Sequence, residues 1–223
     1  MIPNPSSPDT GLPALDDASI APGKRRLIEA ALRLAVVRRT FASLGIRELA
    51  REAGLNPNTF YRHFETLDDL ALETITLIGA RLRPMLHSVR DSAARDDPAH
   101  VASRAVAAFF AFALDHRDAF IIGIAEYHGS SVRVRSALRA LLDEIAREMA
   151  DDVQRLGLAP GLARERLDEV CAQIVLQLFH VSHDYLENPA QRATLLVQSE
   201  RFVVWLLTGA MLNPNAAQVP APN

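Results

Sequence analysis

The side chains best suited to binding another molecule lie close together between positions 56 and 63. A helix starting here would turn an amide, a hydroxyl, a phenol, a guanidinium and an imidazole outward. These groups belong to Asn58, Thr59, Tyr61, Arg62 and His63. Groups of these kinds hydrogen-bond the base edges and phosphates of DNA. We therefore expect a recognition helix that lies in the major groove.

A second helix must brace this one, and the residues directly upstream provide it. Apolar residues recur there at helical spacing, at Ile46, Leu49, Ala50 and Ala53. Gly54 tolerates the positive φ that ends a helix, Asn56 is a good N-cap, and Pro57 suits the first helical position. The pattern predicts a helix-turn-helix. A helical hairpin that does not contact DNA is the alternative.

Charge is distributed unevenly along the chain. The 223 residues carry a net charge of −3. From Gly23 to Phe64, however, there are nine basic and three acidic residues, a local excess of six, which leaves about −9 for the remainder. A basic head on an acidic body is typical of a DNA-binding domain joined to a separate sensing or dimerising domain.

The body is expected to be helical throughout. Helices are predicted at about 24–39, from Asp68 to about Val89 with a kink at Pro84, and at 98–116, 118–127, 132–156, 163–186 and 189–211. With the helix-turn-helix, this gives an all-α fold of about nine helices. The predicted segments are a disordered arm (1–22), a DNA-binding domain (23–66), a ligand-binding and dimerisation domain (67–212) and a loose tail (213–223).

Composition excludes several classes of protein. A single cysteine, Cys171, cannot form an internal disulfide or a thiolate metal site, and its apolar surroundings predict a buried small hydrophobe. No run reaches the roughly 18 consecutive apolar residues of a membrane helix, and the N-terminus has no secretion signal. We expect a cytoplasmic protein without a membrane partner.

Four short runs resemble the N-terminal domain of TetR/AcrR-type transcriptional regulators. They are Phe41-Ala42-Ser43, Arg47-Glu48-Leu49-Ala50, Ala53-Gly54-Leu55 and Thr59-Phe60-Tyr61-Arg62-His63-Phe64. Over residues 24–70 the chain is most similar to FabR-like regulators of unsaturated fatty-acid synthesis genes. The resemblance implies a ligand-responsive homodimer, most often a repressor, that binds a near-palindromic operator.

DNA contacts are expected from eight residues. Asn56, Asn58 and Thr59 would reach base edges or nearby phosphates, and Tyr61 and His63 would hold phosphates, with Arg62 able to do either. Arg47 and Ser43 would contact the backbone from the bracing side. The chain departs from the family at Gly45, where a capping Ser or Thr is common, and at 66–69, where many members carry a lysine.

An apolar cavity is expected in the middle helices. Its predicted lining is Phe109, Phe112, Phe120, Ile124, Tyr127, Arg133, Leu141, Phe179 and His183. If the ligand is an acyl thioester such as acyl-CoA, as the FabR resemblance implies, the chain would enter this cavity and basic residues would meet the phosphates. An aromatic or other apolar effector of an efflux or degradative operon is the alternative ligand, and ordinary core is the alternative to a cavity.

The last two helices have broad apolar faces that predict a four-helix dimer interface. Ile174, Leu178, Val203 and Leu206 are the expected contacts, and a purely internal core is the alternative.

Enzyme and metal chemistry are not expected. His180, His183, Asp184 and Glu187 have the spacing of metal ligands, but polar residues lining a pocket or an interface explain them better. The chain has no Gly-x-Ser-x-Gly elbow, phosphate-binding loop or dinucleotide fingerprint. We therefore predict a protein without cofactor, metal or catalytic residues.

Overall fold

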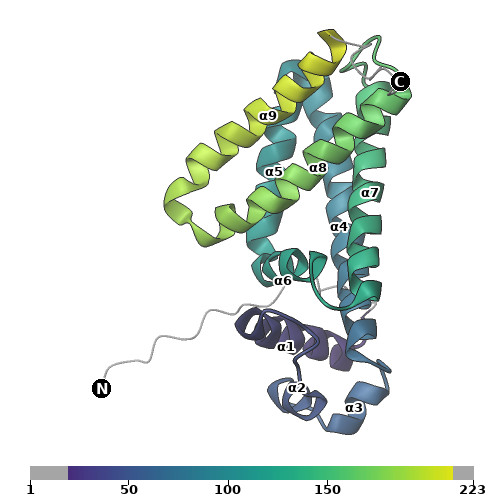
Figure 1. Ribbon diagram of the computed structural model, residues 1–223, viewed down its shortest axis with the longest axis vertical. Helices are drawn as coiled ribbons and strands as arrows, with labels where there is room; N and C mark the ends of the chain where they lie inside the picture. The colour runs from purple at the N-terminus through teal and green to yellow at the C-terminus, as the bar shows by residue number, and fades with distance from the viewer. Residues whose placement is uncertain (1–19, 213–223) are drawn as a thin grey trace, which may run out of the picture.

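The computed structural model describes residues 20–212, and these form an all-helical fold (Figure 1). The helices are α1 (Pro22–Arg38), α2 (Ile46–Glu52), α3 (Pro57–Tyr61), α4 (Leu67–Asp96), α5 (Val101–Asp115), α6 (Arg117–Tyr127), α7 (Val132–Arg155), α8 (Arg164–Glu187) and α9 (Arg192–Leu212). Short 3₁₀ turns, η2 (Pro98–His100) and η3 (Pro189–Gln191), precede α5 and α9. The predicted fold class is confirmed, with nine α-helices and no strand among the described residues.

Helices α1–α3 form a small head at one end of the molecule, and α4–α9 form the body (Figure 1). Local sequence chemistry sets the head's turns as expected. Gly54 has a φ of +63°, and the Asn56 side chain caps α3 by accepting a hydrogen bond from the Asn58 amide. Leu49, Ala50 and Phe60 are buried between the helices.

Helix α4 connects the head to the body. It begins with a capping box in which the Thr66 and Asp69 side chains exchange hydrogen bonds with each other's backbone amides. The expected end near Val89 was too early, because the helix continues to Asp96 with Pro84 inside it. Its 30 residues allow one rigid element to pass from the head along most of the body.

The body packs α7 against both α4 and α8, and α9 folds back onto α8 and α5 through η3. Helix α6 lies across the end of the body that faces α1 (Figure 1). One apolar core fills the body. The core of the head also takes in Ile122 of α6 and Val134 and Leu138 of α7, so the two regions share side chains.

Residues Pro189–Leu212 are long and apolar enough, by length and composition alone, to cross a membrane, with a mean hydropathy of 1.3. In this structure the segment packs on α8 and α5. Only 17% of the apolar stretch is buried, so much of α9 presents apolar side chains to the outside.

Candidate nucleic-acid interface and ligand cavity

The recognition helix lies at the tip of the head, on the side away from the body (Figure 1). Asn58, Tyr61 and Arg62 are exposed, with 61% of the Tyr61 surface open to solvent. Thr59 and His63 are half-buried against the start of α1, where a Cβ on Gly23 would stand 3.0 Å from the His63 Nε2. Five of the predicted contacts therefore share one small convex surface.

Two of the predicted contacts already form hydrogen bonds within the head. The Asn56 Oδ1 accepts from the Asn58 amide at 2.9 Å, and the Ser43 Oγ donates to the Thr40 carbonyl at 3.3 Å. Both residues are exposed. The Asn56 Nδ2 can still donate to a partner, whereas the Ser43 hydroxyl can donate to a phosphate only by turning away from the Thr40 carbonyl.

Six of the nine basic residues of the head fall into two sets of three. Lys24, Arg33 and Arg38 are neutralised by Glu73, Glu52 and Glu48, respectively. Arg47, Arg51 and Arg62 are exposed, and no ion pair joins them to a carboxylate within residues 20–212. Arg51 was not among the predicted contacts, although its place in the same run of basic residues could have suggested it.

A cavity of about 270 Å³ runs through the body. It follows one face of α4, which contributes Ala71, Thr74, Ile75, Ile78, Leu82, Leu86 and Arg90. The opposite walls come from α5, α6, α7, α8 and α9 and are almost wholly apolar. Ligand pockets typically combine such walls with a few polar groups.

The structure places four of the nine predicted pocket residues on the cavity wall, namely Phe109, Phe120, Leu141 and Phe179. The other five do not line it. The Phe112 ring stacks on His116 with centroids 4.0 Å apart, and Arg133 pairs with Asp69 at 2.9 Å. Tyr127 packs against His128 and His180, His183 approaches Asp184, and Ile124 is half-buried outside the cavity.

Sequence reasoning missed the polar residues of the cavity and its extension towards the head. Leu32 of α1 and Phe41, between α1 and α2, line one end. Glu126 and Arg90 also line it, and they are only 2% and 5% exposed. No local pattern indicates these positions, because each depends on contacts between segments far apart in the chain.

Glu126 joins the body to the head. Its Oε1 accepts hydrogen bonds from the Thr40 Oγ1 and the Phe41 amide, both at 2.7 Å. The turn that presents these donors begins at Arg39, which has a left-handed φ of 62° that non-glycine residues rarely adopt. A Cβ on Gly129 would overlap the Glu126 Oε2, so only glycine leaves room for this carboxylate.

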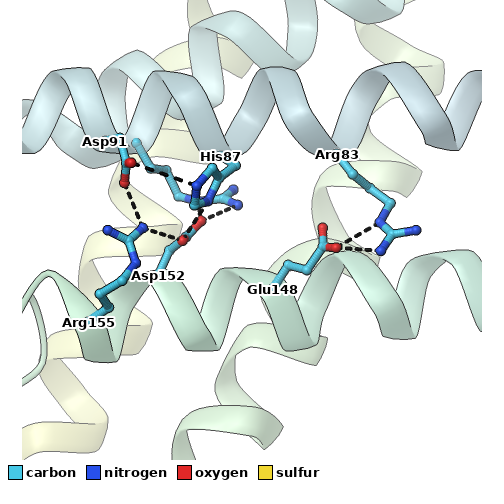
Figure 2. Close-up of polar contacts among 7 residues, drawn as sticks. Arg83, His87, Asp91, Glu148, Asp152 and Arg155 are labelled. Carbon is cyan, nitrogen blue, oxygen red and sulfur yellow. Dashed lines mark hydrogen bonds and ion pairs between the residues drawn. The ribbon is translucent and has the colours of Figure 1, made fainter.

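A polar cluster between α4 and α7 holds Arg90 through Asp152. Figure 2 shows His87, Asp91, Asp152 and Arg155 of this cluster. The Asp152 carboxylate accepts from Arg90 at 2.7 Å, from Arg155 at 2.5 Å, and contacts His87 at 2.8 Å. Burial raises the pKa of Asp152, but the hydrogen bonds from Arg155 and Arg90 outweigh it and hold the pKa below its ordinary value. His87, Asp91 and Asp152 are close enough to share a cation. Arginines already neutralise both carboxylates, so we assign no metal site here.

Three of the four predicted dimer contacts were wrong. Ile174, Leu178 and Val203 are buried inside the protomer and line the cavity, and Leu206 is half-buried. The two last helices are apolar on several sides, so composition alone could not show which side faces inward. The large apolar side chains exposed on α9 are instead Val197, Val204, Trp205 and Leu212. Cys171 is buried as expected, and burial raises the pKa of its thiol to about 12.

Comparison with known proteins agrees with this architecture. The model of the family "Bacterial regulatory proteins, tetR family" matches residues 27–74, which span most of the head and the start of α4. The fatty acid degradation regulator FadR from Bacillus halodurans has a similar structure, with a TM-score of 0.66 and 16% identity over 86% of this chain and 97% of that one.

Two further solved structures extend the likeness. A putative transcriptional regulator from Pseudomonas aeruginosa PAO1 has a TM-score of 0.62 and 23% identity, covering 88% of this chain and 96% of that one. FadR from Bacillus subtilis, in complex with stearoyl-CoA, has a TM-score of 0.59 and 15% identity, covering 82% and 97%. The tetR family model thus matches the head and the start of α4, and the similar solved structures share the fold over most of the chain.

Proposed function

We propose that the protein is a cytoplasmic, homodimeric transcriptional repressor that binds DNA through α3. Its affinity for DNA falls or rises when a lipid binds in the body. The observation that carries the DNA-binding part is the tip of the head. Its polar recognition helix is exposed, and Arg47, Arg51 and Arg62 have no carboxylate partner within residues 20–212. Unpaired cations can bind the phosphates of DNA, and uncharged hydrogen-bonding groups can bind the edges of its bases.

Each residue of the tip has a distinct proposed role. Asn58 and Thr59, with the Asn56 amide, reach base edges at the start of α3. Tyr61 and His63 hold phosphates on one side, while Arg47 and Ser43 hold the backbone on the other. Arg62 contacts a base or a phosphate. Two such heads, in a symmetric dimer, would read half-sites roughly 34–36 Å apart in a near-palindrome.

The test is a fluorescence-anisotropy titration on the DNA upstream of the chain's own reading frame, with selection from random DNA if that fragment does not bind. Tyr61→Phe and Arg62→Ala are expected to weaken binding at least several-fold without changing the dimer. Arg104→Ala, on the body and paired with Asp96, is the matched control. Loss of dimerisation in the head variants, or equal binding by all four proteins, would contradict the assignment.

The dimer is proposed to form through the outer faces of α8 and α9. Trp205 is 63% exposed, and it flanks a shallow groove with Val181 of α8 and Phe202 of α9. The large exposed apolar side chains of α9, namely Val197, Val204, Trp205 and Leu212, mark an interaction surface. Trp205→Glu should yield monomers in analytical ultracentrifugation, whereas Val37→Glu, at an 82% exposed apolar site on the head, should leave the dimer intact.

A fatty acyl compound is the proposed effector. The cavity follows α4 and is almost wholly apolar, and its volume lies just below the range of about 300–1,000 Å³ typical of drug-sized ligands. The similar Bacillus subtilis FadR was solved with stearoyl-CoA. Regulation of fatty acid metabolism genes follows as the proposed role.

An aromatic or other compact apolar effector of an efflux or degradative operon is the second candidate, favoured by Phe109, Phe120 and Phe179 on the cavity wall. Thermal-shift measurements separate the two, because a ligand that binds only the folded state raises its melting temperature. A shift with palmitoyl-CoA but not with planar aromatic compounds supports the lipid, and the reverse supports the alternative.

A further inference from the structure

The cavity has a buried charged side chain near each of its two ends. Arg90 is held by residues of the body, and Glu126 is held by residues of the head. At the far end, the Arg90 guanidinium donates to the Asp152 carboxylate through Nε and Nη2, both at 2.7 Å. Asp152 is in turn held by Arg155 and His87 (Figure 2). The Arg90 guanidinium is therefore fixed in place on the wall of the cavity. These bonds leave Nη1 of Arg90 as a donor for a ligand oxygen.

At the head end, the charged group is Glu126, and its partners belong to the head. Phe41 both lines the cavity and donates its amide to this carboxylate. A ligand that displaces the Phe41 ring therefore pulls on the backbone that Glu126 holds. That backbone leads directly into α2, the bracing helix.

Helix α4 runs along the cavity between these two groups, and residues along it, from Ala71, beside the head, to Arg90, line the cavity. Between Thr74 and Arg90 the residues that α4 presents to the cavity, Ile75, Ile78, Leu82 and Leu86, are all apolar. The path suits one unbranched hydrocarbon chain lying along the helix.

We propose that this cavity measures chain length. Arg90 binds the carbonyl or carboxylate oxygen of an acyl group, the chain extends along α4, and only a chain long enough to displace Phe41 changes how the head is held. The inference rests on the proposed function in one respect, that the effector is an acyl lipid. It adds which residues orient the lipid and which chain lengths act.

Linkage explains why short chains would bind without acting. A ligand shifts an equilibrium between two head positions only by the difference between its affinities for them. A short chain held at Arg90 ends within the apolar part of the path, where it contacts the same side chains in either head position. A long chain meets Phe41 and favours the position in which Glu126 loses its two donors.

The decisive experiment compares octanoyl-, lauroyl-, palmitoyl- and stearoyl-CoA, and the matching free acids, on the full-length protein. Ligand affinity is measured by calorimetry, and operator affinity by anisotropy at saturating ligand. We expect affinity for the ligand to rise gradually with length, while operator affinity changes only beyond a threshold length. A change in operator affinity that simply follows ligand occupancy at every length would overturn the proposal.

The contact with Arg90 is tested by hexadecanol, which has the chain of palmitate without its carbonyl. We expect it to bind about tenfold more weakly than palmitate, the effect of one hydrogen bond to a charged group. Arg90→Met should abolish that difference. Arg83→Met is the matched control. Arg83 also lies on α4 and pairs with Glu148 (Figure 2) and Glu144 of α7, but it does not line the cavity.

The outcomes separate this inference from the function on which it rests. If no acyl compound binds, the proposed lipid effector is wrong, and so is the proposal that the cavity measures chain length. If acyl compounds bind but hexadecanol has the same affinity as palmitate for the unchanged protein and for both arginine variants, the lipid effector is supported and the role of Arg90 is refuted. Glu126→Gln, which keeps the shape but removes the charge, should reduce the effect of bound palmitoyl-CoA on operator affinity, measured at a saturating ligand concentration for each protein. An unaltered effect would refute the link through Glu126.

Discussion

The head and the body use their arginines in opposite ways. In the body, arginines join helices through ion pairs, as Arg83, Arg90, Arg117, Arg155 and Arg164 do. At the tip of the head, Arg47, Arg51 and Arg62 have no carboxylate partner within residues 20–212. These body arginines are neutralised within the fold, whereas the three at the tip leave positive charge available to an external anion, as the proposed DNA-binding surface requires.

The largest expected effect tests this contrast directly. Changing Arg47, Arg51 and Arg62 together to glutamine should weaken DNA binding by orders of magnitude at moderate salt. The slope of log affinity against log salt should become shallower by about 0.9 for each phosphate that the variant no longer neutralises. The matched triple variant changes the paired arginines Arg104, Arg117 and Arg166, and it should leave both quantities unchanged. Equal effects of the two triples would show that only the total charge matters.

The second prediction addresses the paired arginines of the body. Asp152→Asn removes the charge that Arg90 and Arg155 share and leaves the buried Arg90 guanidinium without its ion pair. Removing one member of a buried pair costs about 3–5 kcal/mol, so the free energy of unfolding in urea should fall by that order. Glu187→Gln, which breaks the more exposed pair with Arg117, should cost less than about 1 kcal/mol. Similar decreases would mean that burial of the pair is unimportant.

A smaller effect concerns the pH dependence of stability and compares a buried histidine of the body with an exposed one. Burial lowers the pKa of His116, at the α5–α6 junction, from its ordinary 6.5. The unfolded chain therefore takes up this proton first, so the associated stability is complete above about pH 6.5. It is lost as the pH falls through 6.5 towards the folded value.

His116→Phe keeps the stacking on Phe112 and should flatten the decline in the free energy of unfolding between pH 7.5 and pH 5.5. The matched change His128→Phe, at an exposed ring, should not flatten it. If both variants behave alike, burial of His116 does not control its titration.

The smallest effect compares two glycines within the body. Gly123 lines the cavity, and a Cβ there would contact Leu138 and Phe179 at 3.9 Å, whereas a Cβ on Gly209 would meet nothing within 4 Å. Alanine at either helical position should add about 0.5–1 kcal/mol to the free energy of unfolding. Only Gly123→Ala should also weaken binding of palmitoyl-CoA, which calorimetry would detect. A lower ligand affinity in Gly209→Ala would place the lipid elsewhere.

Sequence reasoning succeeded where short-range chemistry decides the structure. The turn between α2 and α3 could be predicted because Gly54, Asn56 and Pro57 act on their immediate neighbours. Helix boundaries in the body followed from prolines, glycines and capping residues in the same way. The length of α4 was underestimated, because tertiary packing carries the helix beyond Val89.

The inward faces of the helices were the hard part. Ile174, Leu178 and Val203 belong to helices that are apolar on several sides, so nothing in their spacing says which residues face the cavity and which face outward. Arg90 and Asp152 are 62 positions apart, and Glu126 and Phe41 are 85 apart. Pairs of this kind arise from the assembled fold, and no local pattern predicts them.

The shared core between the head and the body limits how this protein can be recombined. Ile122, Val134 and Leu138 complete the apolar core of the DNA-reading unit although they lie more than fifty positions beyond its last helix. A chimera cut after Phe64 would take the recognition helix but leave part of its supporting core behind. Exchange of DNA specificity between such proteins is better achieved by replacing the exposed side chains of α3, because their backbone would keep the support of α6 and α7.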